Sequence, residues 1–217
     1  KKLDLNFIYK ACKTENIKDA IKGVRALNFR GCSVSIPFKS EVINLVDKLD
    51  KSAKTIGAVN TILNQNGVLI GYNTDTTAIM ELLKKTNINI KDKILIIGAG
   101  GVAKAVIYAL KSLGLKKICV ANRTYSNLKR LNKICRIKSV KYSDISKTEF
   151  TVLINATSLG MKSSSDEIDI EQIKNIFNYL KLIFDVVVRN DDTNLIRFAK
   201  HNKIKYISGI QLGQLQA

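Results

Sequence analysis

Two spacings of apolar residues alternate along this chain of 217 residues, one typical of strands and one typical of helices. Short, β-branched apolar runs predict strands at 5–11, 32–38, 56–63, 68–73, 94–97, 118–121, 139–142, 151–156, 182–188 and 205–208. Apolar positions three and four residues apart predict helices at 17–27, 40–49, 75–85, 102–113, 126–135, 170–179 and 193–201. Strands that alternate with helices predict an α/β fold with a mainly parallel, doubly wound sheet.

The first third of the chain differs from the rest and predicts a separate unit. Asn66-Gly67 stands between two apolar runs and predicts a tight hairpin. The elements before Asp75 therefore form an α/β unit of their own. We expect two α/β domains with a cleft between them: 1–75 together with 209–217, and 76–208.

A glycine cluster follows the strand predicted at 94–97. Gly98, Gly100 and Gly101 precede a helical pattern that starts at Val102. Glycines permit a tight turn and close approach of a pyrophosphate, which the free N–H groups of the helix N-terminus can bind. The strand, turn, helix and second strand form a βαβ unit, the setting in which this motif binds a dinucleotide. The alternative is an ordinary β-α turn without a ligand.

The end of the strand at 118–121 distinguishes two dinucleotides. Sites for NAD usually place a carboxylate there to bind the ribose 2′-hydroxyl. Here the sequence is Asn122-Arg123-Thr124, with no carboxylate. A guanidinium suits a 2′-phosphate, which favours NADP over NAD. The alternative is a surface arginine on a basic protein, and it is more credible for the nearby Lys129 and Arg130 than for Arg123.

Composition excludes several classes of function. The formal net charge is +18, but the positive charge is spread out, with no dense basic block and no aromatic-studded basic strand, so we expect no nucleic-acid partner. No apolar run approaches membrane-spanning length, and we expect a cytoplasmic protein with free cysteines. His201 is the only histidine, which makes Ser-His-Asp, Cys-His and multi-histidine metal chemistry improbable.

Several phrases distributed over the whole chain share one resemblance. They are 33–39 (SVSIPFK), 56–61 (IGAVNT), 71–75 (GYNTD), 98–101 (GAGG), 122–124 (NRT), 155–161 (NATSLGM) and 209–216 (GIQLGQLQ). In this order and spacing they resemble the shikimate dehydrogenase family. The early segments 6–11 and 31–33 look most like its shikimate dehydrogenase-like branch, whose substrate is less settled.

The resemblance implies a function and a set of residues. The family reduces 3-dehydroshikimate to shikimate with NADPH in aromatic amino acid biosynthesis, as a monomer or homodimer. Lys39 would be the catalytic acid or base, with Asp75 beside it. Ser35, Asn60 and Gln216 would contact the substrate. Residues that would bind NADP are Gly98, Ala99, Gly100, Gly101, Val102, Asn122, Arg123, Thr124, Thr157 and Gly209. Asn155 and Met161 would line the cofactor cleft.

The residues themselves fit such chemistry, because oxidation of an alcohol must move a hydroxyl proton as well as a hydride. Burial lowers the pKa of a lysine and a neighbouring carboxylate raises it. The sequence therefore leaves open whether Lys39 or Asp75 moves the proton, or whether the pair shares it. Without the motif, Lys39 would be a solvated lysine and Asp75 a helix cap.

The sequence also departs from the family pattern. Val188 stands where the family has a tyrosine, and Asn190 where it has a proline. We expect a chain shortened at both ends, without the family's N-terminal serine segment and its full C-terminal helix. The alternatives are a relative acting on another cyclohexane polyol such as quinate, a catalytically weak NADP-binding protein, and a nucleic-acid-binding module suggested only by the charge.

Overall fold

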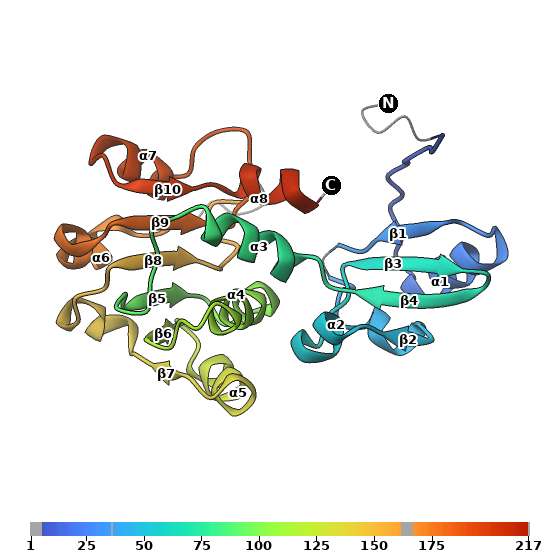
Figure 1. Ribbon diagram of the computed structural model, residues 1–217, viewed down its shortest axis with the longest axis horizontal. Helices are drawn as coiled ribbons and strands as arrows, with labels where there is room; N and C mark the ends of the chain where they lie inside the picture. Colours follow the sequence, from blue (N-terminus) through green and yellow to red (C-terminus); the bar gives the residue numbers. More distant parts are fainter. Residues whose placement is uncertain (1–5, 36, 162–166, 217) are drawn as a thin grey trace.

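The protein folds around two separate β-sheets. The computed structural model describes residues 6–35, 37–161 and 167–216. A four-stranded sheet lies in the first part of the chain and a six-stranded sheet in the rest, with helix α3 (Asp75–Lys84) passing between them (Figure 1). The expected α/β class with two sheet-based units is confirmed.

The larger sheet is parallel throughout. Its strands are β5 (Ile94–Ile97), β6 (Ile118–Ala121), β7 (Lys138–Ser139), β8 (Val152–Asn155), β9 (Leu182–Asp185) and β10 (Lys205–Ile207). Their spatial order is β10-β9-β8-β5-β6-β7. The chain therefore reverses its direction of travel across the sheet beside β5. In open parallel sheets, ligands bind outside the carboxyl ends of the strands at such a reversal.

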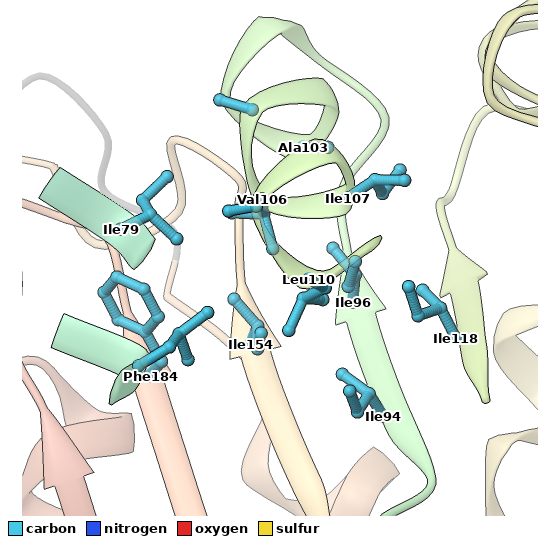
Figure 2. Packing of buried hydrophobic residues seen from close by; sticks show 14 of the residues in the cluster. Ile79, Ile94, Ile96, Ala103, Val106, Ile107, Leu110, Ile118, Ile154 and Phe184 are labelled. Atoms are coloured by element: carbon cyan, nitrogen blue, oxygen red, sulfur yellow. The ribbon is translucent and has the colours of Figure 1, made fainter. Parts of the chain in front are cut away.

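Helices cover both faces of this sheet because its central strands are apolar on both sides. One face packs against α3, α4 (Gly101–Ser112), α5 (Tyr125–Cys135) and Leu212 of α8 (Gly209–Gln216). Figure 2 shows Val106 and Leu110 of α4 lying over Ile96 and Ile154. The other face packs against α6 (Ile170–Ile173), the 3₁₀ segments 142–147 and 174–179, and α7 (Asn194–His201).

The smaller sheet is mixed. Its strands are β1 (Gly31–Ser33), β2 (Lys48–Leu49), β3 (Thr61–Gln65) and β4 (Val68–Tyr72), in the order β1-β3-β4-β2. The predicted hairpin joins β3 and β4, and Asn66 and Gly67 both adopt the positive φ that such a turn requires. Helix α1 (Ile17–Ala26) packs its apolar side on this sheet, and Asn16 caps it by accepting from two backbone amides.

Several predicted elements of the first unit are wrong. Residues 6–11 form no strand, and Phe7, Ile8 and Tyr9 are exposed. Residues 40–49 hold a 3₁₀ turn (Val42–Leu45) and β2 instead of a helix. The start of the strand predicted at 56–63 belongs to helix α2 (Lys51–Ile56), which Asp50 caps. Strand pairing depends on partners distant in the sequence, which an apolar run does not reveal.

The two units pack against each other. Ile56 and Ala58, from the first unit, join the core that α3 and α4 form on the larger sheet. Leu212 of α8 belongs to the same core, although we expected 209–217 to return to the first unit. The division at Asp75 and Gly209 stays a prediction. None of the described helices has the length and apolar character needed to cross a membrane.

Candidate active site

A lysine and an aspartate meet where the chain leaves the smaller unit. Asp75 is the first residue of α3, where a carboxylate interacts favourably with the helix dipole. Lys39 lies in the turn after β1, and its carbonyl accepts a hydrogen bond from the Val59 amide. The Lys39 Nζ atom lies 3.1 Å from Asp75 Oδ2. The side chain of Lys39 is 28% exposed and that of Asp75 8%, so the pair is nearly closed off on the carboxylate side and open at the amine.

Asn60 holds the other carboxylate oxygen. Its Nδ2 donates to Asp75 Oδ1 at 2.6 Å and to Thr74 Oγ1 at 3.0 Å. Its Oδ1 accepts from the Thr74 amide and from the Thr61 hydroxyl. Asn60 is buried and immediately precedes the first residue of β3. Asn60 thereby fixes the start of α3 and the orientation of Asp75.

The other two predicted substrate residues are placed less fully. Ser35 is exposed, two residues beyond β1, and follows Val34, whose amide donates to the Asn60 carbonyl. That backbone contact places Ser35 in the same part of the unit as Asn60. Gln216 ends α8, and its side chain lies outside the described part of the structure.

The glycine cluster forms a tight link between β5 and α4. Gly98 has φ +113°, and a Cβ there would lie 2.7 Å from the Ala156 carbonyl oxygen. Its amide donates to the Ala121 carbonyl, so the turn is joined to two neighbouring strands. Gly100 caps α4 without a side chain, and a Cβ on Gly100 or Gly101 would meet open space. This arrangement leaves the helix N-terminus accessible to an anion.

Two residues beside these glycines pack their side chains into the core. Ala99 is buried, and Val102 packs against the same core from the first turn of α4. Because these side chains pack into the core, a role in binding a ligand would fall to their amides. The sequence pattern placed Val102 correctly in the helix and Ala99 in the glycine cluster, but it could not show which way their side chains point.

The chain after β6 presents a cation at the carboxyl edge of the sheet. Arg123 is exposed two residues beyond Ala121, and α5 begins at Tyr125 after the cap position Thr124. Asn122 Nδ2 donates to the Thr124 carbonyl and shapes this turn. Burial and the charge of Asp169 raise the pKa of Tyr142, while the positive charge of Arg123 acts against that rise. Arg123 therefore lies near the half-buried Tyr142.

The loop after β8 carries the next group of predicted residues. Asn155 is fully buried, so its side chain supports the loop instead of lining an open surface. Its Oδ1 accepts from both the amide and the hydroxyl of Thr157, at 3.0 and 2.7 Å. Thr157 and Met161 are half-buried. Gly209 begins α8, and a Cβ there would lie 2.1 Å from the Val187 carbonyl oxygen, closer than any side chain permits.

One polar residue of this edge was missed by sequence reasoning. Asp185 ends β9, is buried and contacts Asn155, Thr193 and the Val187 amide. A single acidic residue ending an apolar strand was the available signal. Within the described residues, no three His, Cys, Asp or Glu side chains gather as metal ligands, and His201 is exposed.

Comparison with known proteins gives a consistent picture over both units. The model of the shikimate dehydrogenase substrate-binding domain matches residues 1–62, and that of shikimate/quinate 5-dehydrogenase matches residues 81–193. A shikimate dehydrogenase-like protein of Haemophilus influenzae is 41% identical over 217 residues, covering 100% of this chain and 79% of the relative. An NADP(+) shikimate dehydrogenase of Nitrosopumilus maritimus is 32% identical over 218 residues, covering 97% and 78%.

Solved structures agree with these matches. The crystal structure of Thermus thermophilus shikimate 5-dehydrogenase in complex with NADP(H) and shikimate superposes with a TM-score of 0.80 at 30% identity, covering 94% of this chain and 76% of that one. A shikimate 5-dehydrogenase-like protein superposes with a TM-score of 0.89 at 40% identity, over 99% of this chain and 79% of that one. Matches of this extent in both sequence and structure show that the chain belongs to the shikimate dehydrogenase family.

Proposed function

We propose that this protein is an NADP-dependent dehydrogenase that interconverts 3-dehydroshikimate and shikimate. The observation that carries the proposal is the Lys39–Asp75 pair, with Asn60 holding the second carboxylate oxygen. A protein that only bound a dinucleotide would have no evident need for this arrangement outside the glycine turn. Family membership and the named activity of relatives such as the Nitrosopumilus maritimus enzyme support the same conclusion.

We assign to Lys39 the transfer of the hydroxyl proton. Oxidation of a secondary alcohol requires a base near the hydroxyl group, and NADP supplies the hydride acceptor. The amine of Lys39 is the more exposed member of the pair, whereas Asp75 is directed by Asn60. Asp75 keeps the lysine in place and balances its charge. Asn60 acts chiefly by fixing Asp75, because its own amide already has four hydrogen-bond partners.

The residues at the carboxyl edge of the larger sheet fit a dinucleotide phosphate. Gly100 and Gly101 leave open space in front of the N-terminus of α4. Arg123 offers a guanidinium for a 2′-phosphate at the end of β6, where no carboxylate competes. We propose that Thr157 and Gly209 complete the binding surface from the loops after β8 and before α8. NADP is therefore preferred over NAD.

The test is an assay of shikimate oxidation and a separate measurement of NADPH binding. Replacing Lys39 by alanine removes the acid–base group, so we expect kcat to fall by roughly 10²–10⁴-fold. NADPH binding should stay within about twofold, because Lys39 lies in the other unit. Lys147, an exposed lysine paired with Asp144, is the matched control, and its alanine variant should keep full activity.

Three outcomes would contradict the proposal in different ways. Binding of NADPH without turnover of shikimate, quinate or a related polyol would favour the catalytically weak NADP-binding protein. Turnover of quinate alone would keep the dehydrogenase and change the substrate. Equal activity of the Lys39→Ala variant and the parent protein would remove Lys39 from the reaction.

A further inference from the structure

Asp185 joins three segments at the carboxyl edge of the larger sheet. Its Oδ1 accepts from Asn155 Nδ2 at 2.9 Å and from the Val187 amide at 3.1 Å, and its Oδ2 accepts from the Thr193 hydroxyl at 2.6 Å. The residue is 1% exposed, so none of these bonds is shared with solvent. A carboxylate with two oxygens can hold all three donors at once, which no apolar residue can do.

The first connection runs to the loop after β8. Asn155 is held by Asp185 through its Nδ2 and in turn holds Thr157 through its Oδ1. The Thr157 hydroxyl then accepts from the Leu159 amide, which closes the turn. Gly98 packs directly on this loop, since a Cβ there would touch Ala156 and Thr157. The position of Thr157 beside the glycine turn therefore depends on Asn155.

The second connection runs to the start of α8. Asp185 fixes the amide of Val187, and the carbonyl of the same residue lies against Gly209. The missing side chain of Gly209 allows that contact. Asp185 is thus linked to Thr157 through Asn155 and to Gly209 through Val187. The third connection, to Thr193, caps α7 because the same hydroxyl accepts from the Ile196 amide.

Burying the carboxyl group of Asp185 costs free energy, because the charged form loses its contact with water. Burial raises the pKa of Asp185, and the hydrogen bonds from Thr193, Val187 and Asn155 oppose that rise without cancelling it. None of its three hydrogen-bond partners is a cation. Buried polar groups are costly unless they are fully hydrogen-bonded, so an apolar residue would be preferred if packing alone mattered.

We propose that Asp185 is a positioning residue for the dinucleotide, which sets the distance between Thr157 and Gly209. The inference rests on the proposed NADP binding and adds a residue that does not touch the ligand. A misplacement of about 1 Å can slow a reaction about 10²-fold, so a residue that only holds other groups in place can matter for the activity.

The experiment compares NADPH binding by the full chain and its Asp185→Ala variant, measured by NADPH fluorescence in the absence of the second substrate. We expect the dissociation constant to rise by roughly tenfold or more, which corresponds to a loss of about 1.4 kcal/mol in binding free energy. The Asp185→Asn variant keeps an acceptor for Asn155 and Val187 and should bind nearly as well as the parent. Asn155→Ala cuts the connection to Thr157 but leaves Asp185 its bonds to Val187 and Thr193, and it should weaken binding even if Asp185→Ala does not fold.

Asp92 offers a matched control at the opposite edge of the same sheet. It is also buried, and it accepts from the Asn89 amide and from the Thr151 hydroxyl while pairing with Lys181. Asp92→Ala should lower stability and leave the dissociation constant for NADPH unchanged. Binding within twofold of the parent in both Asp185→Ala and Asn155→Ala would overturn the inference while leaving the proposed function intact. A parent protein that binds no NADPH would overturn both.

Discussion

The amide of Asn60 differs from a carboxylate by one group, and it lies 2.6 Å from Asp75. Substituting Asn60→Asp would place two carboxyls at hydrogen-bond distance, and two such groups cannot both ionise at ordinary pH. The pair would hold a shared proton until higher pH, directly beside the amine that carries out the proposed proton transfer. We expect the rising limb of the plot of kcat/KM against pH to shift to higher pH, as measured in shikimate oxidation.

Asn64→Asp is the control for this change, because Asn64 is a buried asparagine on β3, the strand that directly follows Asn60. Its Oδ1 accepts from the Gly67 amide in the hairpin, away from Asp75. That variant should lose stability and keep the pH profile of the parent. A profile that does not move in Asn60→Asp would remove Asp75 and its neighbours from the proton transfer.

At the residue scale, the sequence could name Lys39 and Asp75 only through the family resemblance. Apolar spacing placed Asp75 correctly at the start of a helix, where a cap is the usual reading. The contact between the two side chains spans 36 positions and depends on the turn after β1. Asp185 was missed for the same reason, since its three partners come together only in the folded sheet.

At the scale of elements, the glycine turn between β5 and α4 leaves no room for a side chain at Gly98. Gly98→Ala would add a Cβ 2.7 Å from the Ala156 carbonyl oxygen at a positive φ. The left-handed backbone costs about 1–2 kcal/mol for a residue with a Cβ, and the steric contact adds about 1–3 kcal/mol. We expect a lower denaturation midpoint in urea together with weaker NADPH binding.

Gly114→Ala separates the two costs. Gly114 also has a positive φ, +79°, but a Cβ there would meet nothing within 4 Å. This variant should lose only the backbone contribution, about 1–2 kcal/mol, and bind NADPH as the parent does. Equal losses in both variants would show that contact with the β8 loop is unimportant.

At the amino ends of the strands, Asp92 should make the stability of the protein depend on pH in the acid range. Burial disfavours ionisation of Asp92, but hydrogen bonds from Lys181, the Asn89 amide and Thr151 outweigh it and hold its pKa below the ordinary value. The unfolded chain therefore binds this proton at higher pH than the folded one does. The stabilisation is present above about pH 4 and is lost as the pH falls through the lower folded-state pKa.

Asp92→Asn should accordingly lower the free energy of unfolding at neutral pH, with a difference from the parent that narrows in acid. Urea denaturation at several pH values measures this difference. The exposed Asp19, paired with Lys22, is the control, and its asparagine variant should differ little from the parent at any pH. A constant gap between Asp92→Asn and the parent would contradict the assignment.

Elements of the larger sheet could be predicted from the sequence better than those of the smaller one. β5, β6 and α4 are buried and strongly periodic, so local pattern and tertiary packing agree. The segment 40–49 has helical spacing, yet β2 pairs with β4 and ends any helix there. The apolar run at 6–11 lacks a pairing partner in the described structure, so its composition alone was misleading.

At the scale of the whole molecule, the net charge of +18 acts on anything that approaches it. A field of this sign attracts anions over about a Debye length, and that attraction weakens as salt is added. This attraction acts on a phosphate-bearing dinucleotide as well as it would act on nucleic acid. We propose that Arg123 and the accessible N-terminus of α4 favour the dinucleotide over nucleic acid.

The position of β5 has a consequence for how the chain is made. It is the first strand of the larger sheet to leave the ribosome, and β6 and β7 follow and pair on one side. Its other side must wait for β8, because Ile94 pairs with Val152. Until then the nascent protein carries an incomplete sheet whose unpaired edge strand is β5. All four residues of that strand, Ile94–Ile97, are apolar. The strand β5, which is central in the finished sheet, is thus an edge strand during synthesis.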